Sequence, residues 1–180
     1  AFTAPGAPWE MKDISASGFR LHAPMTVAME LTLSMLVAIR PRGQDAWVLG
    51  IIRRMRRLSA RDAEIGLQLI ASALVSADLF EQRKVRAADY AVNGENPAVT
   101  GRQFLGLFLS FNRREGEPPV QSLVIPAGEY HPSRRYTLRM GNSARTIRYG
   151  RLLEQHSDWV WTVIDPDSPG TVAAGAGSAV

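Results

Sequence analysis

Apolar and polar residues alternate along several short segments of the chain, and this period of two predicts β-strands. In the first half of the chain, the strand candidates are residues 9–15, 19–22, 36–40, 46–58 and 65–69. In the second half they are residues 104–111, 121–125, 136–140, 145–153 and 158–164. Turn signals separate these strands every ~8–12 residues, which is typical of antiparallel barrels and sandwiches.

Two stretches, residues 23–35 and 72–86, are ambiguous; within the second, residues 72–81 could form a short helix or an irregular strand. A turn-like segment at residues 93–97 separates the two β-rich regions. We expect a first β-domain over residues 1–90 with an N-terminal linker, and a second over residues 91–165. The Asp-, Ser-, Pro-, Gly- and Ala-rich residues 166–180 are expected to be a disordered tail.

Composition narrows the chemistry that the chain can support. It has no cysteine, so disulfides, thiolate metal sites and cysteine nucleophiles are excluded. The sequence has no glycine-rich phosphate loop, no nucleophile-elbow motif and no obvious catalytic carboxylate pair. Its three histidines share no metal-ligand spacing. We therefore expect a protein that is not an enzyme, with no catalytic residue, no metal site and no resident cofactor.

The net charge is +4, and nearly all basic residues are arginine, with only Lys12 and Lys84 as lysines. Arginine suits the bidentate recognition of phosphate or guanine. The charge is too small for its length to argue for long nucleic acid, which we regard as an unlikely partner.

No apolar run reaches the roughly 20 residues that a membrane helix requires, so we expect no membrane insertion and a cytoplasmic location. The first residues, Ala-Phe-Thr-Ala-Pro-Gly-Ala-Pro, do not resemble a signal peptide. Since the chain does not begin with methionine, we expect it to be a fragment of a longer protein whose other domains are its partners.

The segment Asp13-Ile14-Ser15-Ala16-Ser17-Gly18 is the most informative part of the sequence. Asp13 and Ser15 are two residues apart, so they project to the same side of an extended backbone. A carboxylate there can accept hydrogen bonds from the N–H groups of guanine, and a hydroxyl can meet a phosphate or carbonyl oxygen. Taken alone, these six residues favour an ordinary turn, in which the same side chains cap their own backbone.

This segment and the strands after it resemble a PilZ domain over about residues 9–71. Asp-x-Ser-x-x-Gly is one of the two signatures of that family, and here the expected strands follow it in order. The matching stretches are Phe19-Arg20-Leu21, Leu36-Val37-Ala38-Ile39, Trp47 to Arg54, and Glu64-Ile65-Gly66-Leu67-Gln68-Leu69. The resemblance implies a six-stranded antiparallel barrel that binds the bacterial second messenger cyclic di-GMP. The expected fold is thus mostly β: a small PilZ-like barrel, then a second barrel or sandwich-like region that carries no recognisable signature.

The sequence departs from the family at its other signature, Arg-x-x-x-Arg, which lies some twenty residues before Asp-x-Ser-x-x-Gly. Only twelve residues precede Asp13, and none is arginine. A literal Arg-x-x-x-Arg at Arg53–Arg57 lies downstream, and the family role is not carried onto it. Two hypotheses remain: a cyclic di-GMP receptor module in second-messenger signalling, or a degenerate PilZ scaffold that binds proteins without a nucleotide.

Five arginines between residues 53 and 61 form either a phosphate-binding patch or a solvated strand end. In a regular strand, Arg54 and Arg56 share one face, opposite Arg53, Met55 and Arg57. The solvated strand end is the more common interpretation; if the domain binds cyclic di-GMP, the face with Arg54 and Arg56 is expected to supply phosphate contacts. The predicted ligand-binding residues are therefore Asp13, Ser15, Ser17, Gly18, Arg20, Arg54 and Arg56.

Overall fold

The computed structural model of the chain describes residues 9–15, 18–41, 43, 46–71, 74–82, 101–111, 116 and 118–166. The described residues are mostly in β-strands, as expected, and they divide into two compact units. The first unit comprises residues 1–74 and 109–111, and the second comprises residues 75–108 and 112–180. Among the described residues, neither short helix is long and apolar enough to cross a membrane.

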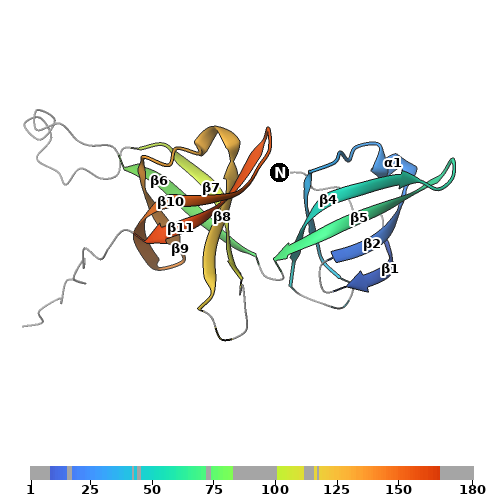
Figure 1. Cartoon of the computed structure of the whole chain (residues 1–180), viewed down its shortest axis with the longest axis horizontal. Helices are drawn as coiled ribbons and strands as arrows, with labels where there is room; N and C mark the ends of the chain where they lie inside the picture. The colour runs from blue at the N-terminus through green and yellow to red at the C-terminus, as the bar shows by residue number, and fades with distance from the viewer. Residues whose placement is uncertain are drawn as a thin grey trace, which may run out of the picture. The chain divides into compact units, whose positions relative to one another are not determined.

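The first unit contains a five-stranded antiparallel sheet in the order β1-β2-β5-β4-β3 (Figure 1). The expected strands are all present: β1 (Glu10–Ser15), β2 (Gly18–Pro24), β3 (Leu36–Ile39), β4 (Val48–Arg57) and β5 (Asp62–Ala71). The ambiguous residues 23–35 include the one-turn helix α1 (Met25–Ala28). The six-stranded barrel implied for this part is thus a five-stranded sheet in the described residues.

One face of this sheet is apolar, because alternate residues of each strand point to the same side. Leu21, Ile52, Ile65 and Leu67 are buried there, and Leu31 packs against them from the segment after α1. The opposite face carries the intervening polar and glycine residues of β2, β4 and β5. The candidate site lies on this second face, which we call the outward face.

The second unit is a closed six-stranded barrel in the order β10-β11-β8-β7-β6-β9. Its strands are β6 (Val75–Gln82), β7 (Gln103–Phe111), β8 (Val120–Pro126), β9 (Arg135–Met140), β10 (Ser143–Gln155) and β11 (Trp159–Pro166), with a 3-10 turn, η2 (Ala127–Glu129). Leu79, Leu123, Tyr136, Ile147 and Val160 fill its core.

The boundary between the units differs from the boundary expected at residue 90. It falls between Leu74 and Val75, because β6 pairs with β7 and β9 of the barrel and not with the first sheet. The ambiguous stretch 72–86 thus contains the first strand of the second unit. Residues 83–100 and 167–180 lie outside the described residues, and so does all but the first residue of the expected tail.

Candidate functional site

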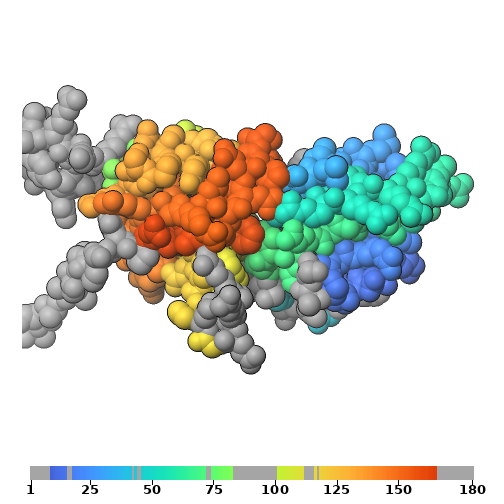
Figure 2. Space-filling view, in the orientation of Figure 1, coloured from blue at the N-terminus to red at the C-terminus, as the bar shows by residue number. Residues whose placement is uncertain are grey.

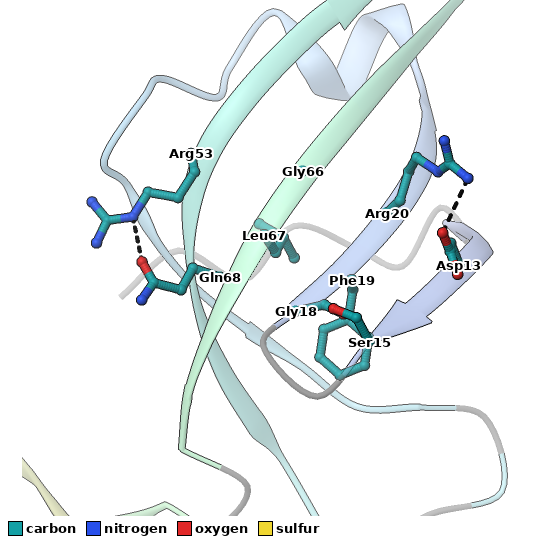
Figure 3. A pocket seen from close by; sticks show the side chains of 9 residues that line it. All are labelled: Asp13, Ser15, Gly18, Phe19, Arg20, Arg53, Gly66, Leu67 and Gln68. Carbon is teal, nitrogen blue, oxygen red and sulfur yellow. Dashed lines mark hydrogen bonds and ion pairs between the residues drawn. The ribbon is translucent and has the colours of Figure 1, made fainter.

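An open pocket of about 480 Å³ lies at the outward face of the first unit. Strands β1, β2, β5 and β4 all contribute to it, as the close-up in Figure 3 shows. The lining residues are Asp13, Ser15, Gly18, Phe19, Arg20, Arg53, Gly66, Leu67 and Gln68. In the space-filling view, blue residues of β1 and β2 and teal residues of β4 reach the surface of this unit (Figure 2). The pocket is therefore a shallow site between side chains on neighbouring strands.

Two glycines keep the middle of the pocket free of side chains. Gly18 pairs with Gln68, and Gly66 lies between Arg20 on β2 and Arg54 on β4. A Cβ atom on Gly18 would lie 1.9 Å from the carbonyl oxygen of Leu67, a separation that no real side chain tolerates. The glycine of the sequence motif is thus required by the close approach of β2 to β5, whatever it does for a ligand.

Asp13 lies at one side of the pocket, and its side chain is 60% exposed. Its carboxylate oxygen accepts a hydrogen bond from the guanidinium of Arg20 at 3.1 Å, because β1 and β2 place the two residues directly opposite each other. Exposed ion pairs of this kind contribute at most ~1 kcal/mol. A ligand that offers better donors than water can therefore displace Arg20 from the carboxylate at little cost.

Ser15 and Gly18 form the end of the β1–β2 hairpin. The Ser15 hydroxyl donates a hydrogen bond to the Gly18 carbonyl at 3.3 Å, which is the local turn contact that the sequence left open as an alternative. The same hydroxyl lines the pocket, so both interpretations of this residue remain compatible with its position. Ser17, another predicted ligand-binding residue, lies outside the described residues.

Arg53 and Gln68 form the other side of the pocket, across the glycines from Asp13 and Arg20 (Figure 3). The Arg53 Nε donates to the Gln68 side-chain oxygen at 2.7 Å. Neither residue is among the predicted ligand-binding residues. The expectation that Arg53 points away from Arg54 was wrong, because β4 is irregular here. Ile52 pairs with Leu67, and Arg54 pairs with Gly66, the residue adjacent to Leu67 on β5. One extra residue of β4 therefore lies between these two pairs.

The structure brings four of the seven predicted ligand-binding residues together: Asp13, Ser15, Gly18 and Arg20 all line the pocket. Arg54 and Arg56 lie on the same outward face, paired with Gly66 and Glu64, but they do not line the pocket. Their contribution to binding stays a prediction. Gly66 and Gln68 belong to the stretch of β5 that resembles the family pattern. They alternate with the buried Ile65 and Leu67, and this alternation predicts that they lie on the outward face.

The chemistry of the pocket suits an anion that carries a planar donor group. Its two arginines and single carboxylate give a net charge of +1, from two positive groups and one negative group. Guanidinium groups bind phosphate oxygens through charge-assisted hydrogen bonds, whereas a carboxylate accepts from N–H groups. The described residues that line the pocket include no histidine, and no three His, Asp or Glu side chains cluster in the described chain as metal ligands would.

Comparison with known proteins gives one match. The family model described as "Cyclic-di-GMP receptor FimW, middle PilZ domain" matches residues 4–74, a range that contains every residue lining the pocket. No curated protein and no solved structure matches the chain. The match thus bears on the first unit.

Proposed function

We propose that the pocket on the outward face of the first unit binds cyclic di-GMP, since residues 4–74 match the family model of a PilZ domain from a cyclic di-GMP receptor. The observation that carries this proposal is the gathering of Asp13, Ser15, Gly18 and Arg20 around one open pocket. The residues of the family match include all of those that line this pocket. The chain then acts as a receptor module within a bacterial cytoplasm and catalyses no reaction.

The proposed mode of binding follows from the donors and acceptors at the pocket. The Asp13 carboxylate exchanges the Arg20 guanidinium for the N1–H and amino group of guanine, two donors that point in the same direction. Arg20, released from the ion pair, is then available to a guanine acceptor or to a phosphate oxygen. The Ser15 hydroxyl adds a donor at the hairpin end. Adenine lacks the N1–H group, so the pocket selects guanine.

Calorimetric titration of the chain with cyclic di-GMP tests the proposal, with cyclic di-AMP as the matched ligand. We expect heat of binding with cyclic di-GMP only. Asp13→Asn keeps the shape of the side chain but replaces one acceptor with a donor, so it should abolish this heat. Asp158→Asn, which changes a carboxylate in the second unit, is the control and should bind like the parent chain. Equal binding of both dinucleotides would contradict the proposed recognition.

The alternative function is a PilZ scaffold that binds proteins without a nucleotide. One observation favours it: the Asp13 carboxylate and the Ser15 hydroxyl both have partners within the hairpin. Under this alternative, the titration gives no heat with either dinucleotide. Retention of a partner protein on the immobilised chain would then be unchanged by added nucleotide.

A further inference from the structure

Strand β10 carries an arginine on the inner side of the second unit's barrel. Arg145, Ile147 and Tyr149 alternate along β10, so they project to the same side of the strand. Ile147 and Tyr149 are buried in the barrel core, and Arg145 lies opposite Leu138 of β9, which is another core residue. Among the described residues, β11 pairs with β10 only as far as Ile147. Arg145 is therefore one alternation beyond the last β10–β11 pair, at one mouth of the barrel.

The guanidinium of Arg145 reaches across the inside of the barrel. Its Cζ atom lies 5.7 Å from the ring centroid of Phe108 on β7. In the closed order β10-β11-β8-β7-β6-β9, β7 is the strand opposite β10. An arginine on β10 therefore meets a ring on β7 only through the interior. Phe108 packs against the same core cluster as Leu138 and Ile147, so the positive charge of Arg145 lies within the barrel mouth.

Two nitrogens of this guanidinium, Nε and Nη2, are buried and have no hydrogen-bond partner among the described residues. These two atoms form one edge of the planar group, and their N–H bonds on that edge are parallel. With this edge an arginine binds both oxygens of a carboxylate or a phosphate. The face of the Phe108 ring attracts the charge but does not replace such a pair of acceptors. Since a buried charge with unpaired donors is costly, these donors call for an anion that the described residues do not supply.

We propose that this barrel mouth binds a carboxylate that carries an apolar group, and that Arg145 holds the carboxylate. The inference concerns the second unit and does not rest on the proposed function of the first. A carboxylate has one negative charge, which neutralises one guanidinium. A phosphate group carries ~1.5–2 negative charges at neutral pH, so it would leave an excess charge in the mouth. The inward residues nearby, Leu138 and Ile147, and the Phe108 ring are apolar and suit an apolar group on the ligand.

Titration of the full chain with hexanoate, followed at the Arg145 Nε–H resonance, tests this proposal. The resonance is assigned by its loss in Arg145→Met. We expect a saturable shift with hexanoate and none with hexanamide, which has the same apolar group without the charge. Inorganic phosphate at the same ionic strength should bind more weakly than hexanoate. N-acetyl-leucine, which imitates the carboxyl end of a polypeptide, separates the two sources of such a ligand: tighter binding than hexanoate indicates a chain end, and weaker binding a free organic acid.

Substitutions at Arg145 and a matched control separate binding from folding. Arg145→Met should weaken hexanoate binding by about tenfold or more, measured from the Leu138 and Ile147 amide shifts, since it removes a charge-assisted contact. Arg145→Lys keeps the charge but not the two parallel donors, so its affinity should fall between those of the parent and Arg145→Met. Arg148→Met is the control, because Arg148 is exposed on the outer side of the same strand, and it should bind like the parent.

The stability of the barrel without ligand gives a second readout. Arg145→Met removes an unpaired buried charge, so the barrel should resist urea at least as well as in the parent. A large loss of stability would show that the guanidinium already has a partner in the folded chain, and the proposal would fall. It would also fall if hexanoate caused no saturable shift in the parent, if hexanamide bound equally well, or if Arg145→Lys and Arg145→Met both bound hexanoate like the parent.

Discussion

Replacing Gly18 by alanine should strongly destabilise the first unit, although the substitution adds only one methyl group. The added Cβ would lie 1.9 Å from the Leu67 carbonyl oxygen, whereas carbon and oxygen atoms in close contact between strands are about 3.3 Å apart or more. The strands must therefore separate by roughly 1.4 Å, the difference between these two distances. The atom in the way is backbone, so no side-chain rotation relieves the contact.

The cost of Gly18→Ala follows from two contributions. Overpacking inside a folded protein typically costs about 1–3 kcal/mol. Separation of β2 from β5 also weakens the ladder around Gly18 and Gln68, at about 1 kcal/mol for each hydrogen bond lost. We expect the free energy of unfolding of the first unit to fall by about 3 kcal/mol or more. Since native domains are stable by only ~5–15 kcal/mol, this is a large fraction of the total.

Urea unfolding of the full chain, followed by amide hydrogen exchange and mass spectrometry, separates the two units. Peptides from β2 and β5 should lose protection at lower urea in Gly18→Ala, while peptides from the barrel stay unchanged. Gly128→Ala is the control, because a Cβ there meets no atom within 4 Å and its backbone is not left-handed. If Gly18→Ala leaves the first unit as stable as the parent and removes only ligand binding, the glycine serves the ligand and the packing argument is refuted.

Three further predictions concern the second unit. The Tyr149 hydroxyl is buried without a hydrogen-bond partner among the described residues, so Tyr149→Phe should leave the free energy of unfolding unchanged or raise it; a loss above ~1 kcal/mol in urea unfolding would contradict this. Burial raises the pKa of Tyr136 to about 12, so its neutral form is favoured by folding. This contribution to the free energy of unfolding is complete below about pH 10 and is lost as the pH rises from 10 through about 12. Tyrosinate absorbance of the folded chain should show one tyrosine that ionises near pH 12. Ionisation of all tyrosines near pH 10 in the folded chain would refute this prediction. Arg102→Ala removes the 2.8 Å partner of Glu129, whose side chain is only 11% exposed, and should destabilise the barrel by about 1–3 kcal/mol at neutral pH; an unchanged urea midpoint would show that this pair contributes nothing.

The strands of both units could be predicted from alternation because each sheet has one apolar face. The alternating residues of β2 and β5, for example, give Leu21 and Ile65 to the core and Arg20 and Gly66 to the outward face. The unit to which residues 75–82 belong could not be predicted from alternation. Their strand belongs to the second unit because of pairing with β9, which lies more than fifty residues away in sequence. Such distant pairing leaves no local pattern.

About half of the site was predictable. Asp13, Ser15 and Gly18 belong to one contiguous motif, and a hairpin keeps contiguous residues together. Arg53 was not predicted, because a period of two places it on the core-facing side of β4. Only the irregular register between Ile52 and Arg54, a β-bulge, places it on the outward face. A bulge depends on how two strands pair, so the sequence of β4 alone contains no sign of it. Gln68 was missed for a related reason, because its hydrogen bond to Arg53 forms only in the irregular register of β4 and β5.

We propose that the glycine-lined pocket, with its exposed carboxylate and two arginines, binds cyclic di-GMP. The most direct test is the amide NMR spectrum of the full chain during titration with this dinucleotide. We predict saturable shifts at Asp13, Gly18, Gly66 and Gln68, with the barrel core unaffected. A spectrum in which these four amides stay in place at saturating dinucleotide would contradict the claim.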